Sequence, residues 1–138
     1  METRVIVADS RRARIFSSHT VMNKLVEEEG FVHNEARLAN RDLVSDAPGR
    51  SANRADSYSP PMSAKEHEVR NFAKDLARHL KALHSQQHFE QLVLIASPRF
   101  LGMLKQELHP PLDRLVSRTI DKDMTTADVA HIIDEIKS

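Results

Sequence analysis

Three carboxylates in this sequence could hold a divalent metal for catalysis. Asp9 follows a short apolar run, and Glu66 and Glu68 lie near the start of a predicted helix. Acids from different elements that meet at one point can bind a metal ion and activate water for hydrolysis. A further carboxylate would be expected after the second apolar run, 91–96, but Ser97 follows that run instead. A metal-dependent nuclease or other hydrolase is therefore one hypothesis for the function, and it is the alternative to a non-catalytic binding role. Otherwise Asp9 is expected to accept hydrogen bonds in the turn that follows it.

Histidine is the second residue type that could bind a metal, and the chain has eight. His84 and His88 are four residues apart, the spacing of two ligands on one face of a helix. No third ligand lies nearby in the sequence, and the other six histidines are scattered along it. We therefore predict neither a metal site nor a cofactor.

A candidate anion site lies where the second apolar run meets a helix. Ser97 is a good N-cap residue, and Pro98 fits the first helical position. Free amides at a helix N-terminus bind anions, and ligands of open α/β sheets usually lie beyond the carboxyl ends of strands. Arg99 adds a cation. Ser97 and Arg99 are therefore predicted binding residues, although capping alone would explain Ser97.

A second candidate binding segment is the stretch 37–62, which has 26 residues and no apolar period. Loops usually have about 4–6 residues, so a stretch this long is either functional or disordered. Its basic residues are all arginine, whose planar side chain can bind phosphate at two points. We predict that 41–58 is a mobile arm that becomes ordered on an anionic partner, with RNA as the expected class. The predicted contact residues are Arg37, Arg41, Asp46, Gly49, Arg50 and Arg54.

The composition fits one globular domain, 1–138, with 40% hydrophobic and 29% charged residues. The net charge is zero, so no overall field draws the protein to nucleic acid or membrane. The absence of cysteine excludes disulfides and a thiol nucleophile. The apolar run before Asp9 is too short for a signal peptide or a membrane span, and a cytoplasmic location is expected.

Hydrophobic patterns predict five strands and three helices. The strands are expected at 4–8, 13–18, 25–33, 91–96 and 115–121. The third is ambiguous: it could contain a bulge near Gly30, or a short helix from Thr20 could end there. The first helix begins with a capping box at Ser63 and runs to about Gln86. The second starts at Ser97 and stops at two prolines, 110 and 111, and the third starts with a capping box at Thr125.

This order of elements predicts the topology. A meander followed by right-handed crossovers gives a mixed five-stranded sheet with strand order 3-2-1-4-5 and helices on both faces. The second strand is antiparallel to the rest, which is the RNase H-like arrangement. Strands 4–8 and 91–96 are expected to be adjacent, parallel and buried on both faces.

Several stretches, in order, resemble the bacterial host-attachment protein family: VADSRRARIF, DLVSDAPGR, NFAKDLARHL, LVLIASPRFLGMLKQEL and IDKDMT. That family is similar to the middle domain of archaeal and eukaryotic class I release factors, where a long loop carries a Gly-Gly-Gln tripeptide. The stretch 37–62 has one glycine, Gly49, and no glutamine, so peptidyl-tRNA hydrolysis is not expected. The family name implies a role in attachment to host cells, and the resemblance favours a non-catalytic protein that binds RNA or the ribosome. The oligomeric state, monomer or dimer, does not follow from the sequence.

Overall fold

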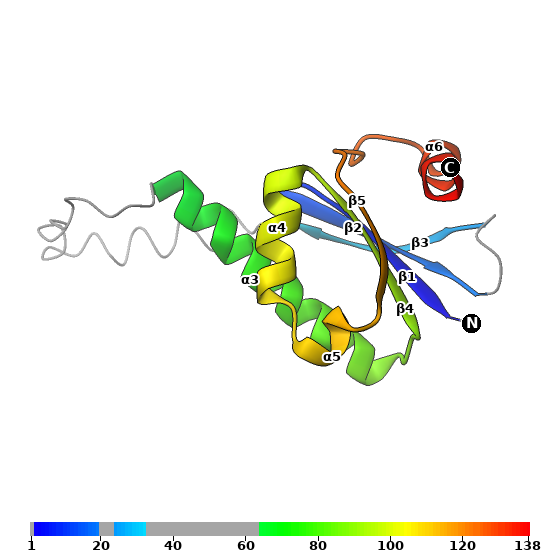
Figure 1. Ribbon diagram of the computed structural model, residues 1–138, viewed down its shortest axis with the longest axis horizontal. Coiled ribbons are helices and arrows are strands. Elements are labelled where there is room, and N and C mark those ends of the chain that lie inside the picture. The colour runs from blue at the N-terminus through cyan, green and yellow to red at the C-terminus, as the bar shows by residue number, and fades with distance from the viewer. Residues whose placement is uncertain (1, 20–23, 33–63) are drawn as a thin grey trace, which may run out of the picture.

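The computed structural model describes residues 2–19, 24–32 and 64–138. Element labels are those of Figure 1. The strands are β1 (Thr3–Ala8), β2 (Arg12–Ser18), β3 (Val26–Val32), β4 (Gln91–Ala96) and β5 (Val116–Ile120). The helices are α3 (Ala64–Gln86), α4 (Pro98–Glu107), α5 (Pro110–Asp113) and α6 (Val129–Lys137).

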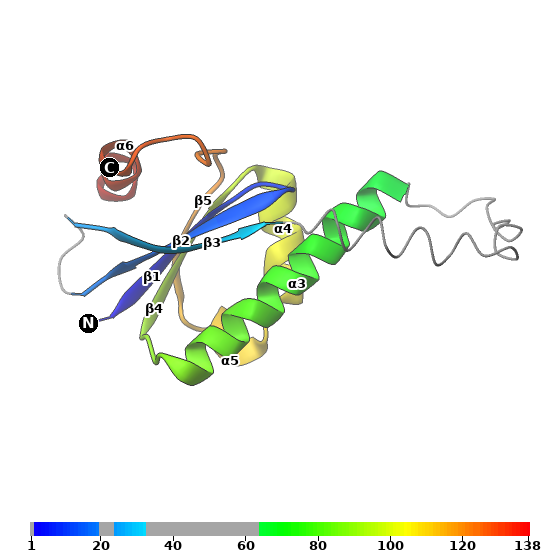
Figure 2. The ribbon, with the colours of Figure 1, turned by 180° about the vertical axis from the view of Figure 1, so that it is seen from behind.

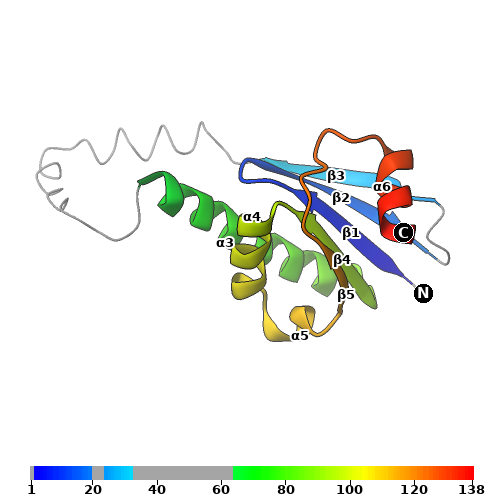
Figure 3. The same ribbon diagram turned by 45° about the horizontal axis from the view of Figure 1, so that its top comes forward.

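The five strands form one sheet in the order β3-β2-β1-β4-β5, as Figure 3 shows from one edge to the other. β2 pairs antiparallel with both β1 and β3, whereas β4 pairs parallel with both β1 and β5. The predicted RNase H-like topology is therefore confirmed.

β1 and β4 form the centre of the core. Val5 pairs with Val93 and Ile6 with Leu94, and these four side chains are buried. Because side chains alternate across a strand, Val5 and Ile6 face opposite sides of the sheet. Uninterrupted apolar strands such as these occur where both faces of a sheet are covered.

Helices cover both faces, as predicted. α3, α4 and α5 pack on the face that carries Ile6, through apolar residues such as Leu76, Leu80 and Leu104. α6 covers the other face through Ile132 and Ile136. Figure 2 shows the sheet between α6 and the α3–α4 pair. Within the described residues, no helix combines the length and apolar character needed to cross a membrane.

The structure adds detail to two local expectations and contradicts a third. The irregularity in β3 falls at Glu28, because Ile15 pairs with Glu29 and the next residue of β2 with Glu27, while Gly30 pairs regularly with Arg14. The prolines at 110 and 111 open the short helix α5, since proline is compatible with a first helical turn. α6 is capped by Asp128, not by Thr125. Ser63, the predicted cap of α3, lies outside the described residues.

Candidate anion-binding site at the carboxyl ends of the central strands

A pocket of about 460 Å³ lies beyond the carboxyl ends of β1 and β4. The two strands end side by side, with Ala8 opposite Ala96. The chain leaves β1 into a hairpin and leaves β4 into α4, so the strand connections diverge here, where ligands of open α/β sheets bind. The pocket is lined by Ser10, Lys65, Glu66, Val69, Ser97, Arg99, Phe100 and Met103.

The walls of this carboxyl-end pocket come from the first turns of α3 and α4. α3 contributes Lys65 and Glu66, and α4 contributes Arg99. The apolar lining is held by the core, since Phe100 is 2% exposed and stacks on Phe72 with ring centroids 5.7 Å apart. The polar groups are therefore mounted on a rigid apolar base.

Ser97 occupies the N-cap position of α4, as predicted. Its backbone is extended and its carbonyl accepts the amide of Leu101 at 2.9 Å, but its hydroxyl makes no capping hydrogen bond. Pro98 has no amide hydrogen, and the next two amides, of Arg99 and Phe100, have no intrahelical acceptor. The hydroxyl and these two amides form a set of donors suited to an oxyanion.

Arg99 contacts Glu66 and so joins α4 to α3. The Arg99 side chain is 68% exposed and that of Glu66 34%. An ion pair this exposed contributes about 0–1 kcal/mol, so it holds the guanidinium only weakly. Lys65 is also exposed. With two cations and one carboxylate, the pocket has a net positive charge and a guanidinium that an anionic ligand can recruit.

The contacts of the predicted carboxylates differ. Asp9 accepts hydrogen bonds from the amides of Arg11 and Arg12, at 2.8 and 2.9 Å, and from the Thr125 hydroxyl at 3.3 Å. Its expected role in the turn is therefore confirmed. Glu66 and Glu68 lie on α3, which packs on the face opposite α6. Within the described parts of the chain, no three acids or histidines could hold a metal ion together.

The loop residues predicted to bind lie outside the described residues: Arg37, Arg41, Asp46, Gly49, Arg50 and Arg54. Their roles stay predictions. In the sequence, the stretch 37–62 is followed by Ser63 and then by Ala64, the first residue of α3, which precedes Lys65 in the wall of the pocket.

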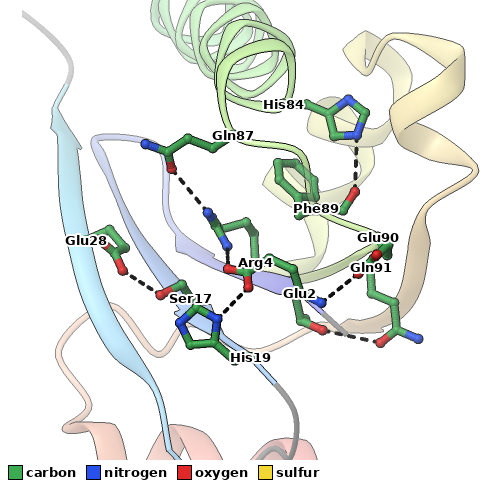
Figure 4. Close-up of polar contacts among 11 residues, drawn as sticks. Glu2, Arg4, Ser17, His19, Glu28, His84, Gln87, Phe89, Glu90 and Gln91 are labelled. Atoms are coloured by element: carbon green, nitrogen blue, oxygen red, sulfur yellow. Dashed lines mark hydrogen bonds and ion pairs between the residues drawn. The ribbon is translucent and has the colours of Figure 1, made fainter.

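At the amino-terminal edge of the sheet, a polar cluster surrounds Arg4 (Figure 4). Arg4 is 7% exposed, contacts Glu2, and donates to Oε1 of Gln87 at 3.2 Å. Its guanidinium also lies 5.5 Å from the centroid of the Phe89 ring. Partial burial alone would raise the pKa of Glu2, but hydrogen bonds and charge from Arg4 and His19 lower it. The partners of the Arg4 guanidinium thus all come from the protein itself, and the cluster joins β1 to the α3–β4 connection.

His84 and His88 lie near this cluster, with ring centroids 4.9 Å apart. Nε2 of His84 is 3.1 Å from the Phe89 carbonyl oxygen, so this ring nitrogen donates to the backbone. His84 thus makes a structural hydrogen bond near the end of α3.

The sequence indicated part of the carboxyl-end pocket. Ser97, Arg99 and Glu66 were each singled out, and the structure brings all three together. Ser10, Lys65 and the apolar lining were missed. Only the packing of α3 against α4 brings these residues to the pocket. In the sequence, Val69, Phe100 and Met103 are indistinguishable from ordinary core residues.

The sheet order and the helices on both faces define an α/β protein of RNase H-like topology. The chain belongs to the family of proteins required for attachment to host cells, whose family model matches residues 4–136.

A curated relative and two solved structures show further similarity. An uncharacterized protein of Rickettsia prowazekii (strain Madrid E) is 30% identical over 82 residues, which is 58% of this chain and 52% of the relative. The chain thus spans about half the length of this relative. A Ppx/GppA phosphatase of Aquifex aeolicus is 15% identical with a TM-score of 0.45, covering 87% of this chain and 35% of the phosphatase. A structure described as an archaeal protein is 9% identical with a TM-score of 0.46, covering 99% and 39%. Likenesses this distant carry nothing about activity or ligands.

Proposed function

We propose that this host-attachment-family protein is a non-catalytic domain that binds RNA, either free or in the ribosome. The carboxyl-end pocket would bind one phosphate, and the arginines of 37–62 would bind others. One observation carries the proposal: Arg99, Lys65 and the free amides of α4 converge at the carboxyl ends of the central strands.

The lining of the pocket favours a nucleotide over a simple inorganic anion. Val69, Phe100 and Met103 line the pocket beside the cations, and Val69 is the most exposed of the three. A nucleotide has a flat base that can pack on such a surface and a phosphate that the guanidinium and amides can bind. Proteins that read single-stranded RNA stack its exposed bases on aromatic side chains or on arginine guanidinium groups. We therefore infer that the ligand is single-stranded where it enters the pocket.

The described residues support binding more than catalysis. The Asp9 carboxylate accepts three hydrogen bonds from its turn and from Thr125, and Glu66 contacts Arg99. The stretch 37–62 has no glutamine to position water for peptidyl-tRNA hydrolysis. The proposal includes an intracellular location. We also propose that this protein resembles release-factor middle domains in using the segment between the sheet and the long helix to contact its partner.

Fluorescence anisotropy with a labelled single-stranded RNA tests this function. The parent should bind saturably, and Arg99→Gln should weaken binding on the order of tenfold, because a charge-assisted hydrogen bond contributes about 1.5–3 kcal/mol. Lys137→Gln, which removes an exposed cation in α6, is the matched control and should bind like the parent.

Two outcomes would overturn the proposal. One is a parent protein that neither binds RNA nor sediments with ribosomes. The other is cleavage of the RNA that requires Mg²⁺ and is lost in Asp9→Asn, which would support the nuclease hypothesis instead.

A further inference from the structure

Three cations form a row along α3, away from the carboxyl-end pocket. Lys74, Arg78 and Lys81 are four and three residues apart, a spacing that places them on one face of the helix. All three are exposed. α3 buries its other face through residues such as Phe72, Leu76 and Leu80. The row is therefore a feature of the protein surface.

This row forms one wall of a groove of about 270 Å³, which we call the basic groove. It is lined by Lys74, Ala77, Arg78, Lys81, Glu107 and His109. Ala77 is a small residue, 5% exposed, between the cations. The opposite wall comes from the junction of α4 and α5, where His109 is the N-cap residue of α5. The groove thus runs along the same α3–α4 seam as the carboxyl-end pocket.

The cations of the basic groove are poorly neutralised. Its one acid, Glu107, already contacts Arg70 at 3.5 Å. Arg78 is 3.4 Å from Asp75, but its side chain is 70% exposed. Within residues 2–19, 24–32 and 64–138, neither Lys74 nor Lys81 has an ion-pair partner. The groove therefore has a net positive charge, although the whole chain has none.

We propose that the basic groove binds successive phosphates of the single-stranded RNA whose nucleotide enters the carboxyl-end pocket. This inference rests on the proposed function and adds a path for the strand. Lys65 and Lys74 are both on α3, nine residues apart, which is about 13 Å along the helix axis and about half a turn around it. The strand would therefore also pass around the side of α3. A stacked strand advances about 3.4 Å per nucleotide, so at least about four nucleotides are needed to connect the two sites.

The lining favours a nucleic acid over an acidic protein. Protein interfaces depend on buried aromatic and apolar anchors, and the basic groove offers only Ala77. Interfaces with nucleic acid are more polar and more positively charged. A row of cations at intervals of one helical turn matches a partner with regularly repeated charges and needs no apolar anchor.

The double variant Lys74→Gln/Lys81→Gln tests this path, with Lys24→Gln/Lys137→Gln as the matched control. Lys24 precedes β3 and Lys137 lies in α6, and both are exposed. Binding of a labelled twelve-nucleotide RNA is measured over a series of salt concentrations. For single strands the slope of log K against log salt is about −0.7 per phosphate contact. The groove variant should therefore lose about 1.4 from the magnitude of this slope, and the control should lose none.

The outcomes separate this inference from the proposed function. If the parent binds RNA and Arg99→Gln weakens it, but the groove variant matches the control, only the path along α3 is wrong. If the parent neither binds RNA nor sediments with ribosomes, both fail. If poly-glutamate competes as well as RNA of equal charge, and the groove variant abolishes that competition, the groove is an acidic-protein site and the inference is overturned.

Discussion

Arg99 is the residue on which the candidate site most depends. It lies on the first turn of α4, and its exposed guanidinium meets Glu66 across the pocket. A phosphate that enters the pocket competes with Glu66 for this guanidinium. Glu66 therefore limits affinity in the proposed mode of binding and adds little to stability, because exposed ion pairs are weak.

Glu66→Gln tests this competition. The substitution removes a negative charge from the pocket and leaves Arg99 free, so the RNA affinity should rise several-fold at low salt. The free energy of unfolding should change by less than about 1 kcal/mol, the usual limit for an exposed ion pair or a helix-dipole contact. RNA titration and urea denaturation measure the two quantities. Weaker RNA binding by Glu66→Gln would mean that this carboxylate contributes to the site directly.

Among the elements, α6 has a titratable cap. Asp128 accepts the amide of His131 at 2.9 Å, and the same carboxylate is 2.6 Å from Nδ1 of His131. The backbone hydrogen bond from His131, with that from its side chain, lowers the pKa of Asp128 below 3.8. Asp128 in turn raises the pKa of His131 above 6.5. The pair is fully charged between these two titrations.

The pH dependence of stability follows from these shifts. The Asp128 contribution is present above pH 3.8 and is lost as pH falls through its lowered pKa. The His131 contribution is present below pH 6.5 and is lost as pH rises through its raised pKa. Asp128→Asn keeps a good N-cap and removes the charge. The Tm difference between parent and variant should therefore be largest between the two titrations. A difference that does not change with pH would contradict the charged pair.

The elements also show what local sequence can predict. β1 and β4 are apolar throughout, and α3 has a long apolar stripe, so hydrophobic pattern alone located them. The cap of α6 was misassigned because Thr125 and Asp128 are both good N-cap types. The Thr125 hydroxyl instead lies 2.8 Å from Asp123 and 3.3 Å from Asp9, and its one hydrogen is shared between these two acceptors. Asp9 is 116 positions earlier in the chain. Contacts between elements this far apart leave no local pattern, which is also why Lys65 and Ser10 were missed.

At the scale of the whole molecule, the zero net charge is unevenly distributed. The carboxyl-end pocket and the basic groove place Lys65, Lys74, Arg78, Lys81 and Arg99 along the α3–α4 seam. Because the molecule has no overall positive field, association with RNA gains little from long-range steering. The affinity should come from short-range phosphate contacts, so it should depend on the shape of the RNA strand as well as on its charge.

The most direct test of the proposed function is an NMR titration of the ¹⁵N-labelled protein with a short single-stranded RNA. Amides at the start of α4, those of Arg99 and Phe100, should show the largest saturable shifts, with further shifts at Lys65. The amides of α6, which lie on the opposite face, should stay in place. Saturable shifts confined to α6, or no shifts even with a large excess of RNA over protein, would contradict binding at the carboxyl ends of the central strands.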